Sequence, residues 1–446
     1  MAKTLVATLA AAAIMACSAS PVPAFQPIEV TGGHDSLLFR MERYSSRSPA
    51  LSPGGTWVAW YSDSDSLVPG DDNGDIDVFA REIFTGTVKC VSISPEGIPA
   101  GTGGTLDTPR GISVSAGGEF IAFVASDGNG NPDVLVRDMK GRSTSLVSVN
   151  TSGQPGNGPS LSPSISRDGR FVAFASFASD LVHDDFNGLP DIFVRDLETG
   201  VTERISTGLD GEEPDGPSFL PSISWDGRMV SFTSEATNML PDRRDPGASV
   251  YVFDRGTRRT SLISISSDGK AANGNSFSLG NSLSGDGRNV LFRSEATNLT
   301  AVDTNAVEDL FVRDLASGAT IRASLGNGMT ESGQGALSGA LDFEGRTVAF
   351  SSSSDHLVKG DVNFGVDIFV RDLQTGRVEI VSRASNGDPL FTEASDPVIS
   401  GNGKIVAFSA RPLDLLTGRG MEHWQVFVHD RVTKKTFWIS DPQAKP

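Results

Sequence analysis

The chain has 446 residues, among them 49 Gly and 24 Pro, and its formal net charge is −18. This acidic balance, without clusters of Lys and Arg, argues against nucleic acid or an anionic membrane surface as partner, because both bind basic patches. Only 21% of the residues are charged, and Gly, Pro, Ser, Asp and Asn are frequent. Such a composition is typical of many short strands joined by tight turns.

Residues 1–24 have the pattern of a secretory signal. One Lys is followed by an apolar run that is too short to span a bilayer comfortably, and then by small residues. Cleavage after Ala24 is one alternative, and lipidation of Cys17 is the other, because the text IMAC resembles a lipobox. Cys90 is the only other cysteine, so an exported mature chain forms no disulfide of its own. We expect the protein in the periplasm or as an outer-membrane lipoprotein, with secretion as the alternative.

Residues 25–48 form an N-terminal segment before the first repeat. Its text RMERYS, residues 40–45, resembles the text VTERIS of a later fourth strand and is a candidate for a ring-closing strand. The text KTFWIS, residues 435–440, fits the same position. The sequence leaves both alternatives open.

A phrase of the form D-G-R-x-V-A-F recurs through residues 49–442. Its aromatic position falls at Trp60, Phe123, Phe174, Phe232, Phe292, Phe350 and Phe408, and most steps are 58 or 60 residues. A second phrase, D-[IVL]-F-V-R-D, ends at Glu82, Asp138, Asp196, Asp254, Asp314, Asp372 and Asp430. Two independent phrases therefore give the same count of seven copies.

Each copy is predicted to contain four strands. In the third copy these are residues 163–166, 170–176, 191–196 and 202–206. A D-G or G-G turn joins the first two strands, and a short hairpin such as LETG joins the last two. The runs FVAF and DIFV are apolar at consecutive positions, which suits strands buried on both faces. The sequence thus predicts an all-β fold, a seven-bladed β-propeller of four-stranded blades, with an open β-solenoid as the structural alternative.

The two phrases resemble the repeats of the TolB-like β-propeller family of exported bacterial proteins. The resemblance covers about residues 49–442, and it implies a periplasmic or outer-membrane-associated propeller. TolB itself carries an α/β domain before its propeller, whereas only some 25 residues separate the signal from the first copy here. The resemblance therefore supports the fold and the compartment, but not the partner or role of TolB.

The pattern D-x-N-x-x-x-D precedes the third strand in five of the seven copies. Its residues are Asp71, Asn73 and Asp77; Asp127, Asn129 and Asp133; Asp185, Asn187 and Asp191; Asp303, Asn305 and Asp309; and Asp361, Asn363 and Asp367. The fourth copy has Arg243, Asp245 and Ser249 at these positions, and the seventh has Arg419, Met421 and Gln425.

These loops are candidate calcium sites. Hard oxygen ligands at alternate loop positions are those that Ca²⁺ prefers, but each loop offers two carboxylates, where a calcium site has six to eight oxygens. The alternative is turn chemistry, because Asp and Asn side chains bond their own backbone and tolerate left-handed turns. No other cofactor is predicted.

The repeated R-D pair at the end of the third strand is expected to tie hairpins and neighbouring blades together by charge-assisted hydrogen bonds, since catalysis breaks symmetry. The histidines are His34, His183, His356, His423 and His429. They show no metal-binding spacing such as H-E-x-x-H, and no G-x-S-x-G elbow is present. No catalytic residue is predicted.

Three functions remain open from the sequence. The first is an exported scaffold that binds a protein, a peptide or a cell-envelope component at one ring face, as a monomer that meets a membrane only through a lipid anchor. Loops such as 94–111 and 208–219 are acidic and glycine-rich, and loops on a rigid scaffold usually carry recognition. The second is an enzyme, a hydrolase or lyase, with its site at the central channel. The third is a purely structural surface protein.

Overall fold

The computed structural model describes residues 28–30, 44–86, 88–93, 101–103, 111–126, 131–241, 247–301, 303–305, 307–331, 333–361, 363, 365–388, 391–414, 419–420 and 422–440. The predictions for the signal segment 1–24, for Cys17 and for Asp127 and Asn129 fall outside these residues.

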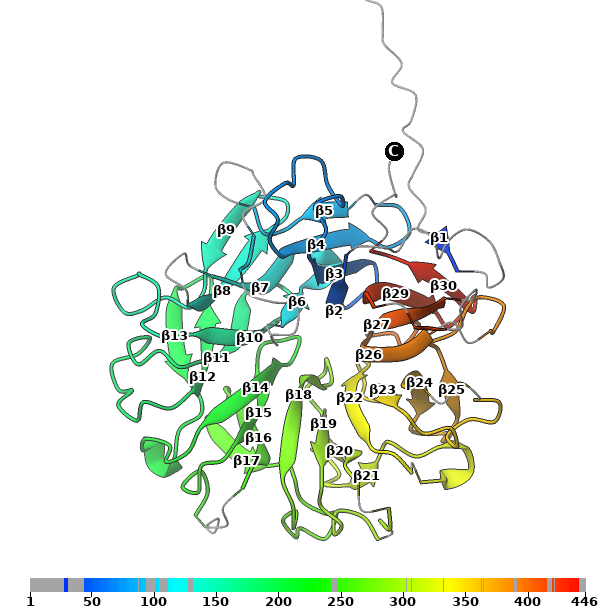
Figure 1. Cartoon of the computed structure of the whole chain (residues 1–446). Coiled ribbons are helices and arrows are strands. Elements are labelled where there is room, and N and C mark those ends of the chain that lie inside the picture. The colour runs from blue at the N-terminus through cyan, green and yellow to red at the C-terminus, as the bar shows by residue number, and fades with distance from the viewer. Residues whose placement is uncertain are drawn as a thin grey trace, which may run out of the picture.

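Seven antiparallel sheets are arranged around a central axis (Figure 1), so the predicted seven-bladed propeller is confirmed. Blade 1 contains β2 (Ser46–Leu51), β3 (Trp57–Ser62), β4 (Asp77–Glu82) and β5 (Val88–Cys90), and blade 2 contains β6 (Ile112–Val114), β7 (Phe120–Ser126), β8 (Pro132–Asp138) and β9 (Ser143–Leu146). Blade 3 contains β10 (Ser160–Ile165), β11 (Phe171–Ser176), β12 (Asp191–Asp196) and β13 (Val201–Arg204), and blade 4 contains β14 (Ser218–Ile223), β15 (Met229–Ser234), β16 (Ser249–Asp254) and β17 (Arg259–Leu262).

The remaining blades follow the same order. Blade 5 contains β18 (Ser276–Leu283), β19 (Asn289–Ser294), β20 (Asp309–Asp314) and β21 (Thr320–Arg322), and blade 6 contains β22 (Ala336–Leu341), β23 (Thr347–Ser352), β24 (Asp367–Asp372) and β25 (Val378–Ile380). Blade 7 contains β26 (Phe391–Ile399), β27 (Ile405–Asp414), β29 (Gln425–Asp430) and β30 (Lys435–Trp438), with β28 (Arg419–Gly420) paired to β27. The helical segments of the described chain are the 3₁₀ turns η2 (Ala116–Gly118), η3 (Leu209–Gly211) and η4 (Asn327–Met329).

The C-terminal strand β30 is the fourth strand of the last blade. It lies within the KTFWIS text, and the short N-terminal strand β1 (Ile28–Glu29) pairs along its outer edge. Residues 40–43 of the RMERYS text lie outside the described residues. The next residues bond to the last blade, since Ser46 N donates to Trp424 O at 2.7 Å and Gln425 Nε2 donates to Tyr44 O at 2.6 Å. Blades 1 and 7 are thereby held side by side.

Cross-strand aromatic pairs fill the blades and explain why the phrases recur. The pairs, all between the second and third strands, are Trp60–Phe79, Phe174–Phe193, Phe232–Tyr251, Phe292–Phe311, Phe350–Phe369 and Phe408–Phe427, with ring centroids 5.6 to 6.2 Å apart. All of these rings are buried. Burial of large aromatic pairs is a main source of stability in sheet cores.

The antiparallel order gives the ring two distinct faces. The turn face carries the D-G turns and the hairpins between third and fourth strands, such as 167–169 and 197–200 in blade 3. The loop face carries the loops between second and third strands and the connections to the next blade, such as 177–190 and 207–217. The D-x-N-x-x-x-D pattern lies on the loop face.

A belt of backbone hydrogen bonds joins the blades at the turn face. The donor and acceptor pairs are Ala116 to Arg167, Arg167 to Trp225, Trp225 to Gly285, Asp286 to Phe343, Phe343 to Gly401 and Gly401 to Pro53, at 2.8 to 3.1 Å. At the junction from blade 1 to blade 2, the residue at the donor position is Pro53, which has no N–H to donate. The turns therefore hold the ring together around its axis.

The glycine of the D-G turn is required by both conformation and space. Gly169 has φ +79°, and a Cβ there would come 2.2 Å from the ring of Phe120 in the preceding blade. Only glycine combines this backbone conformation with so close an approach.

Among the described residues, no helix is long and apolar enough to cross a membrane.

Candidate functional site

A tryptophan at the turn face reaches across the ring to contact three other blades. Trp225 stacks against Phe343 with ring centroids 4.6 Å apart. Gly401 lies against the indole, where a Cβ would come 2.2 Å from Cη2 of Trp225, and Gly285 packs against both rings. Any larger residue at either glycine would collide with this aromatic pair.

The cavity beside Trp225 is small and carries no ionisable side chain in its described lining. It has a volume of about 80 Å³ and is bounded by small and apolar residues of the first strands, with Asn281 as the one amide. A general acid, a base or a charged nucleophile would have to come from elsewhere. The lining of this cavity supplies no cluster of His, Asp or Glu, while the first strands β2 and β26 also carry Arg47 and Asp396, which interact electrostatically.

The second aspartate of the D-x-N-x-x-x-D pattern locks the third strand to the fourth. Its Oδ1 accepts from a serine hydroxyl 15 residues later, in the pairs Asp77–Ser92, Asp133–Ser148, Asp191–Ser206, Asp309–Ser324 and Asp367–Ser382. The asparagine holds the other oxygen, since Nδ2 of Asn73, Asn187 and Asn305 donates to Oδ2 of Asp77, Asp191 and Asp309 at 2.8, 3.1 and 2.9 Å. Two of the three residues in the pattern thus have structural partners.

The first aspartate of the pattern is buried next to the second. In blade 3, Asp185 is 4% exposed, and oxygens of Asp185, Asp191 and Glu213 lie within 4.8 Å of one another. Burial and the neighbouring Asp191 raise the pKa of Asp185 to about 6, against the opposing effect of Arg204. Such a group of carboxylates needs a positive charge among them.

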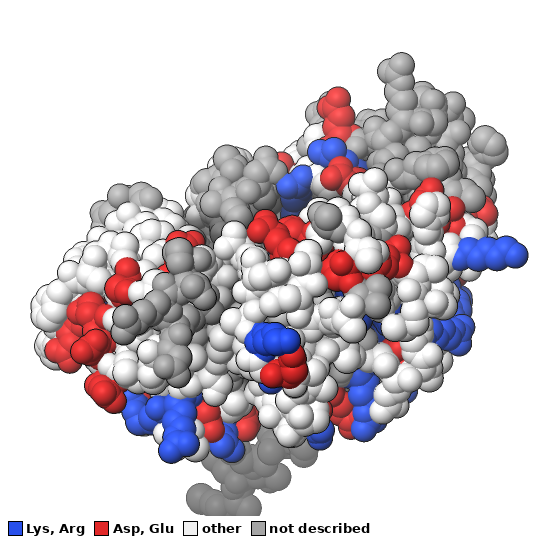
Figure 2. Space-filling model, turned by 90° about the horizontal axis from the view of Figure 1, so that it is seen from below, with Lys and Arg blue, Asp and Glu red and all other residues white. Residues whose placement is uncertain are grey.

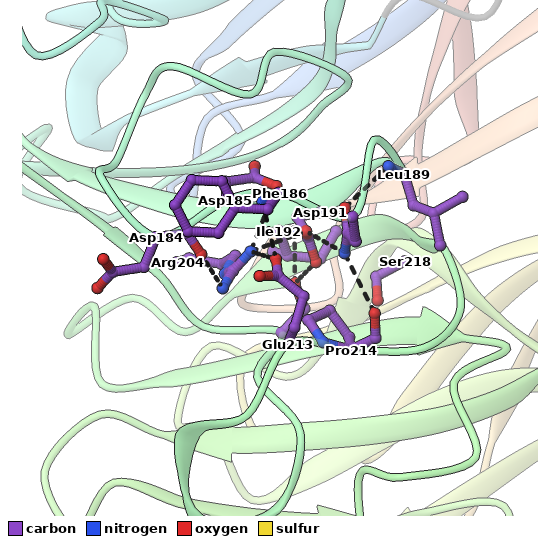
Figure 3. Close-up of polar contacts among 12 residues, drawn as sticks. Asp184, Asp185, Phe186, Leu189, Asp191, Ile192, Arg204, Glu213, Pro214 and Ser218 are labelled. Carbon is purple, nitrogen blue, oxygen red and sulfur yellow. Dashed lines mark hydrogen bonds and ion pairs between the residues drawn. The ribbon is translucent and has the colours of Figure 1, made fainter.

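An arginine supplies that charge in blade 3 (Figure 3). Arg204, at the end of β13, points its Nη1 among the carboxylates, 3.4 Å from Asp185, 3.4 Å from Asp191 and 2.5 Å from Glu213. Its Nη2 donates to the carbonyl of Asp184 at 2.6 Å. The guanidinium occupies the place that a metal ion would take between these three carboxylates.

Blade 5 repeats this arrangement. Arg322 lies 3.2 Å from Asp303 and 2.9 Å from Asp309, and it also bonds Glu331. In blade 6, Arg383 partly offsets the burial that raises the pKa of Asp361.

Blade 1 has the two aspartates of the pattern and no arginine at this position; blades 2 and 6, with Leu146 and Ile380 there, also lack it. Cys90 stands there, with its Sγ 3.8 Å from Oδ1 of Asp77. Burial, then Asp77 and Asp65, raise the pKa of Asp71 to about 6, and Oδ1 of Asp71 has no hydrogen-bond partner. The loops of the different blades are therefore alike in sequence pattern but not in charge balance.

The R-D pairs act in blade-to-blade and hairpin contacts, as expected. Arg371 donates to the carbonyl of Leu325 in the preceding blade at 2.5 Å. The aspartate of the pair bonds an arginine other than its neighbour, because Asp196 accepts from Nε and Nη2 of Arg170, the arginine of D-G-R, at 3.0 and 2.7 Å. Asp254 with Arg228 and Asp314 with Arg288 repeat this bidentate contact.

The structure does not bring the two C-terminal histidines together. His423 precedes β29 and lies 3.4 Å from the hydroxyl of Ser45. His429 lies near the other end of β29, buried, with Nδ1 2.8 Å from Thr436 Oγ1. It stands where the other blades have the arginine of R-D, which makes it a structural residue.

Sequence reasoning missed the two arginines of the loop face. Arg204 and Arg322 each follow the second aspartate of their pattern by 13 residues and precede a glutamate by nine. The identical spacing in two copies was a usable signal. The pair of Trp225 and Phe343 carried no such signal, because it occurs once.

Acidic side chains dominate the loop face. The segments 63–76, 177–190 and 207–217 contain no Lys or Arg, and their acidic residues are Asp63, Asp65, Asp71, Asp72, Asp75, Asp180, Asp184, Asp185, Asp210, Glu212, Glu213 and Asp215. Figure 2 views the ring from its edge and shows many of the Lys and Arg of this side along the lower rim, with Asp and Glu both there and above it.

Comparisons with known proteins agree on the propeller. No family model matches the chain, and no curated protein matches it in sequence. The chain is similar to an oligogalacturonate lyase from Vibrio parahaemolyticus, with 13% identity and a TM-score of 0.52 over 87% of this chain and 90% of that chain. It is also similar to a structure from a study of two prolyl endopeptidases, with 16% identity and a TM-score of 0.55 over 92% of this chain. The match covers 52% of that second chain, so the protein spans about half its length.

TolB structures are among the matches as well. TolB from Acinetobacter baumannii is 17% identical, with a TM-score of 0.41 over 81% of this chain and 75% of that chain. The TolB-like propeller fold expected from the repeat phrases is confirmed by the seven blades themselves. At these identities the similarities show the fold alone.

Proposed function

We propose that the protein is an exported propeller that binds a basic protein or peptide on its loop face. One observation carries the proposal: the loop face presents long segments of acidic residues without any Lys or Arg. A surface of one charge sign attracts partners of the other and steers their approach. Export rests on the signal-like residues 1–24.

Blade 3 offers an anchor point within this acidic surface. Phe186, in the middle of its D-x-N-x-x-x-D loop, is 81% exposed and lies beside Asp184 and Glu213 (Figure 3). Phe177 and Leu209 are exposed on the same face of the blade. Exposed aromatic side chains surrounded by charge are typical centres of binding interfaces, and a ring face also attracts Lys or Arg directly.

The proposal is tested by capture from envelope extracts with matched variants. The loop-face variant carries Asp184→Asn, Asp210→Asn and Glu212→Gln, and the turn-face control carries Glu119→Gln, Glu198→Gln and Glu344→Gln. All six side chains are exposed, and each variant removes three negative charges. We expect the wild type and the turn-face variant to retain the same basic protein, and the loop-face variant to lose it, with wild-type binding weakened by salt.

Two results would contradict the proposal. One is equal capture by both variants, which would place the interface elsewhere. The other is a bound partner that is acidic or is held independently of salt. Adding Phe186→Ser to the wild type should reduce capture without changing its dependence on salt.

A further inference from the structure

The arginine of the R-D phrase has a threonine partner on the fourth strand in several blades. Nη1 of Arg137, Arg195 and Arg313 donates to Oγ1 of Thr144, Thr202 and Thr320, seven residues later, at 2.9 to 3.0 Å. In blade 6 the arginine is Arg371, and Val378 stands opposite it. Blade 6 therefore buries this guanidinium without the hydroxyl that its counterparts use.

The edge of Arg371 that suits a carboxylate has no strong acceptor. The residue is 5% exposed, and its Nη1 donates to the carbonyl of Leu325 in the preceding blade at 2.5 Å. Nη2 donates to Sδ of Met329 at 3.4 Å, which is a weak acceptor, and Nε has no hydrogen-bond partner among the described residues. Nε and Nη2 form the edge through which arginine binds a carboxylate with two parallel hydrogen bonds, as Arg170 binds Asp196.

Other arginines with an unpartnered nitrogen differ from Arg371. Nε of Arg293, Arg322 and Arg411 also lacks a hydrogen-bond partner, but each of these guanidiniums has a carboxylate oxygen within 3.4 Å. Arg81 also faces a valine, but its Nε donates to a backbone carbonyl at 3.1 Å. In the described part of the chain, Arg371 forms no ion pair, and burial and the nearby Arg322 lower its pKa.

A groove opens beside Arg371 on the outer side of the ring (Figure 1). It lies between blades 5 and 6, along the outermost strand β21, and has a volume of about 620 Å³. Ile321, Leu325, Met329 and Leu373 form its apolar lining. The other charged groups of the lining, Arg322 and Glu331, bond one another. The groove has the size of a small-molecule site, with Arg371 as its unpaired charge.

The methionine that covers Arg371 is held in a strained backbone conformation. At the corresponding loop position, blades 2, 4 and 6 have Gly153, Gly269 and Gly387, all with positive φ. Blade 5 has Met329 there, with φ +65°, a conformation that disfavours every residue with a Cβ. Met329 is nevertheless 64% exposed, so burial of its own side chain does not explain why it stands there.

We propose that the groove between blades 5 and 6 binds a small apolar carboxylate. Met329 moves aside, the carboxylate accepts from Nε and Nη2 of Arg371, and the apolar body of the ligand lies against Ile321 and Leu373. The ligand thus supplies the negative charge that a buried guanidinium needs, and its apolar surface leaves water. An amine of the same shape is repelled, and an alcohol leaves the guanidinium without its counter-charge.

Methyl NMR of the full chain, labelled at its methionine methyl groups, tests this with hexanoate as the probe. We expect hexanoate to shift the signal of Met329, which Met329→Leu assigns. The dissociation constant should be on the order of 10⁻³ to 10⁻² M, the scale for a ligand of about eight non-hydrogen atoms. 1-Hexanol, which lacks the charge, and acetate, which lacks the apolar chain, should bind at least about tenfold more weakly.

Two pairs of variants locate the site. Arg371→Gln should weaken hexanoate binding by at least about tenfold, whereas Arg195→Gln, the matched change in blade 3, should leave it unchanged. Because Arg371 also bonds the preceding blade, the second pair leaves it in place. Ile321→Glu puts a negative charge at a 42% exposed position of the groove and should weaken binding to the same extent. Its control is Val201→Glu, at a 59% exposed position of blade 3.

The proposal is overturned if hexanoate leaves the Met329 signal unchanged, or if 1-hexanol binds as well as hexanoate. It is also overturned if folded Ile321→Glu binds hexanoate like the wild type. The inference does not rest on the proposed partner, because the groove lies on the outer side of the ring. Hexanoate binding can therefore fail while capture on the loop face persists.

Discussion

The two faces of the ring treat their carboxylates in opposite ways. On the turn face, hydrogen bonds from Arg170, the first and largest cause, hold the pKa of Asp196 well below its usual range. On the loop face, burial raises the pKa of Asp71 and of Asp185 to about 6. Turn-face carboxylates stabilise the fold. Burial of the loop-face carboxylates instead costs folding free energy, and groups that are retained despite such a cost are those on which function is expected.

The largest expected effect comes from Arg204→Ala. Removing one partner of a buried ion pair leaves the others uncompensated, which costs about 3–5 kcal/mol. Arg204 has 7% of its side chain exposed and bonds three carboxylates, so we expect a loss of free energy of unfolding in this range, measured by chemical denaturation at pH 7.

The double variant Arg204→Ala with Asp185→Asn is the control for this prediction. It removes one of the stranded charges, so we expect it to be more stable than Arg204→Ala alone. If the two variants are equally stable, the carboxylates of blade 3 are not the reason for the loss.

The next largest effect is a dependence of stability on pH that comes from His429 at the turn face. Burial, with a contribution from Lys434, lowers its pKa to about 4, from about 6.5 in the unfolded chain. Between these values the unfolded chain binds the proton and the folded chain does not, so stability rises with pH from 4 to 6.5 and is fully present above 6.5. The shift corresponds to about 3 kcal/mol.

His429→Gln should remove this part of the pH dependence. Denaturation curves of the wild type and the variant at pH 4.5 and pH 7.5 measure it. If the wild type loses no more free energy of unfolding than the variant between pH 7.5 and pH 4.5, His429 takes up its proton in the folded state and the prediction is wrong.

The smallest effect is expected for Arg170→Ala on the turn face. The side chain of Arg170 is 39% exposed, and exposed ion pairs contribute little because solvent and salt screen them. The contribution of Asp196 is present above its unfolded pKa, near 4, and is lost as pH falls below that value. The melting temperature should fall slightly at pH 7 in low salt, and the difference should vanish in high salt. A large, salt-independent loss would mean that this pair also holds the blades together.

Most of the fold could be predicted from the sequence because the same phrases recur in seven copies, so a strand that is ambiguous in one copy is clear in the others. The recurring aromatic and R-D positions identified the second and third strands, and the D-G turns identified the turn face. The bounds of the first strands were harder to predict. The prediction of residues 163–166 missed that β10 runs from Ser160 to Ile165 with a bulge, at which Ser162 has φ +55°.

The site was less accessible from the sequence. The D-x-N-x-x-x-D pattern identified the loops between second and third strands, but it treated the five loops that keep it as equivalent. Their difference depends on the residue at the end of the fourth strand, Arg204 in one blade and Cys90 in another, which reaches the loop only through strand pairing. A contact of this kind is not visible in spacing within one loop.

The most direct test of the division between the two faces is hydrogen exchange of the full chain with and without a ten-lysine peptide. The account predicts that the peptide slows exchange in segments 63–76, 177–190 and 207–217 of the loop face, and leaves turns 167–169 and 197–200 unchanged. Slowed exchange at these turns, with no change in the loop segments, would contradict it.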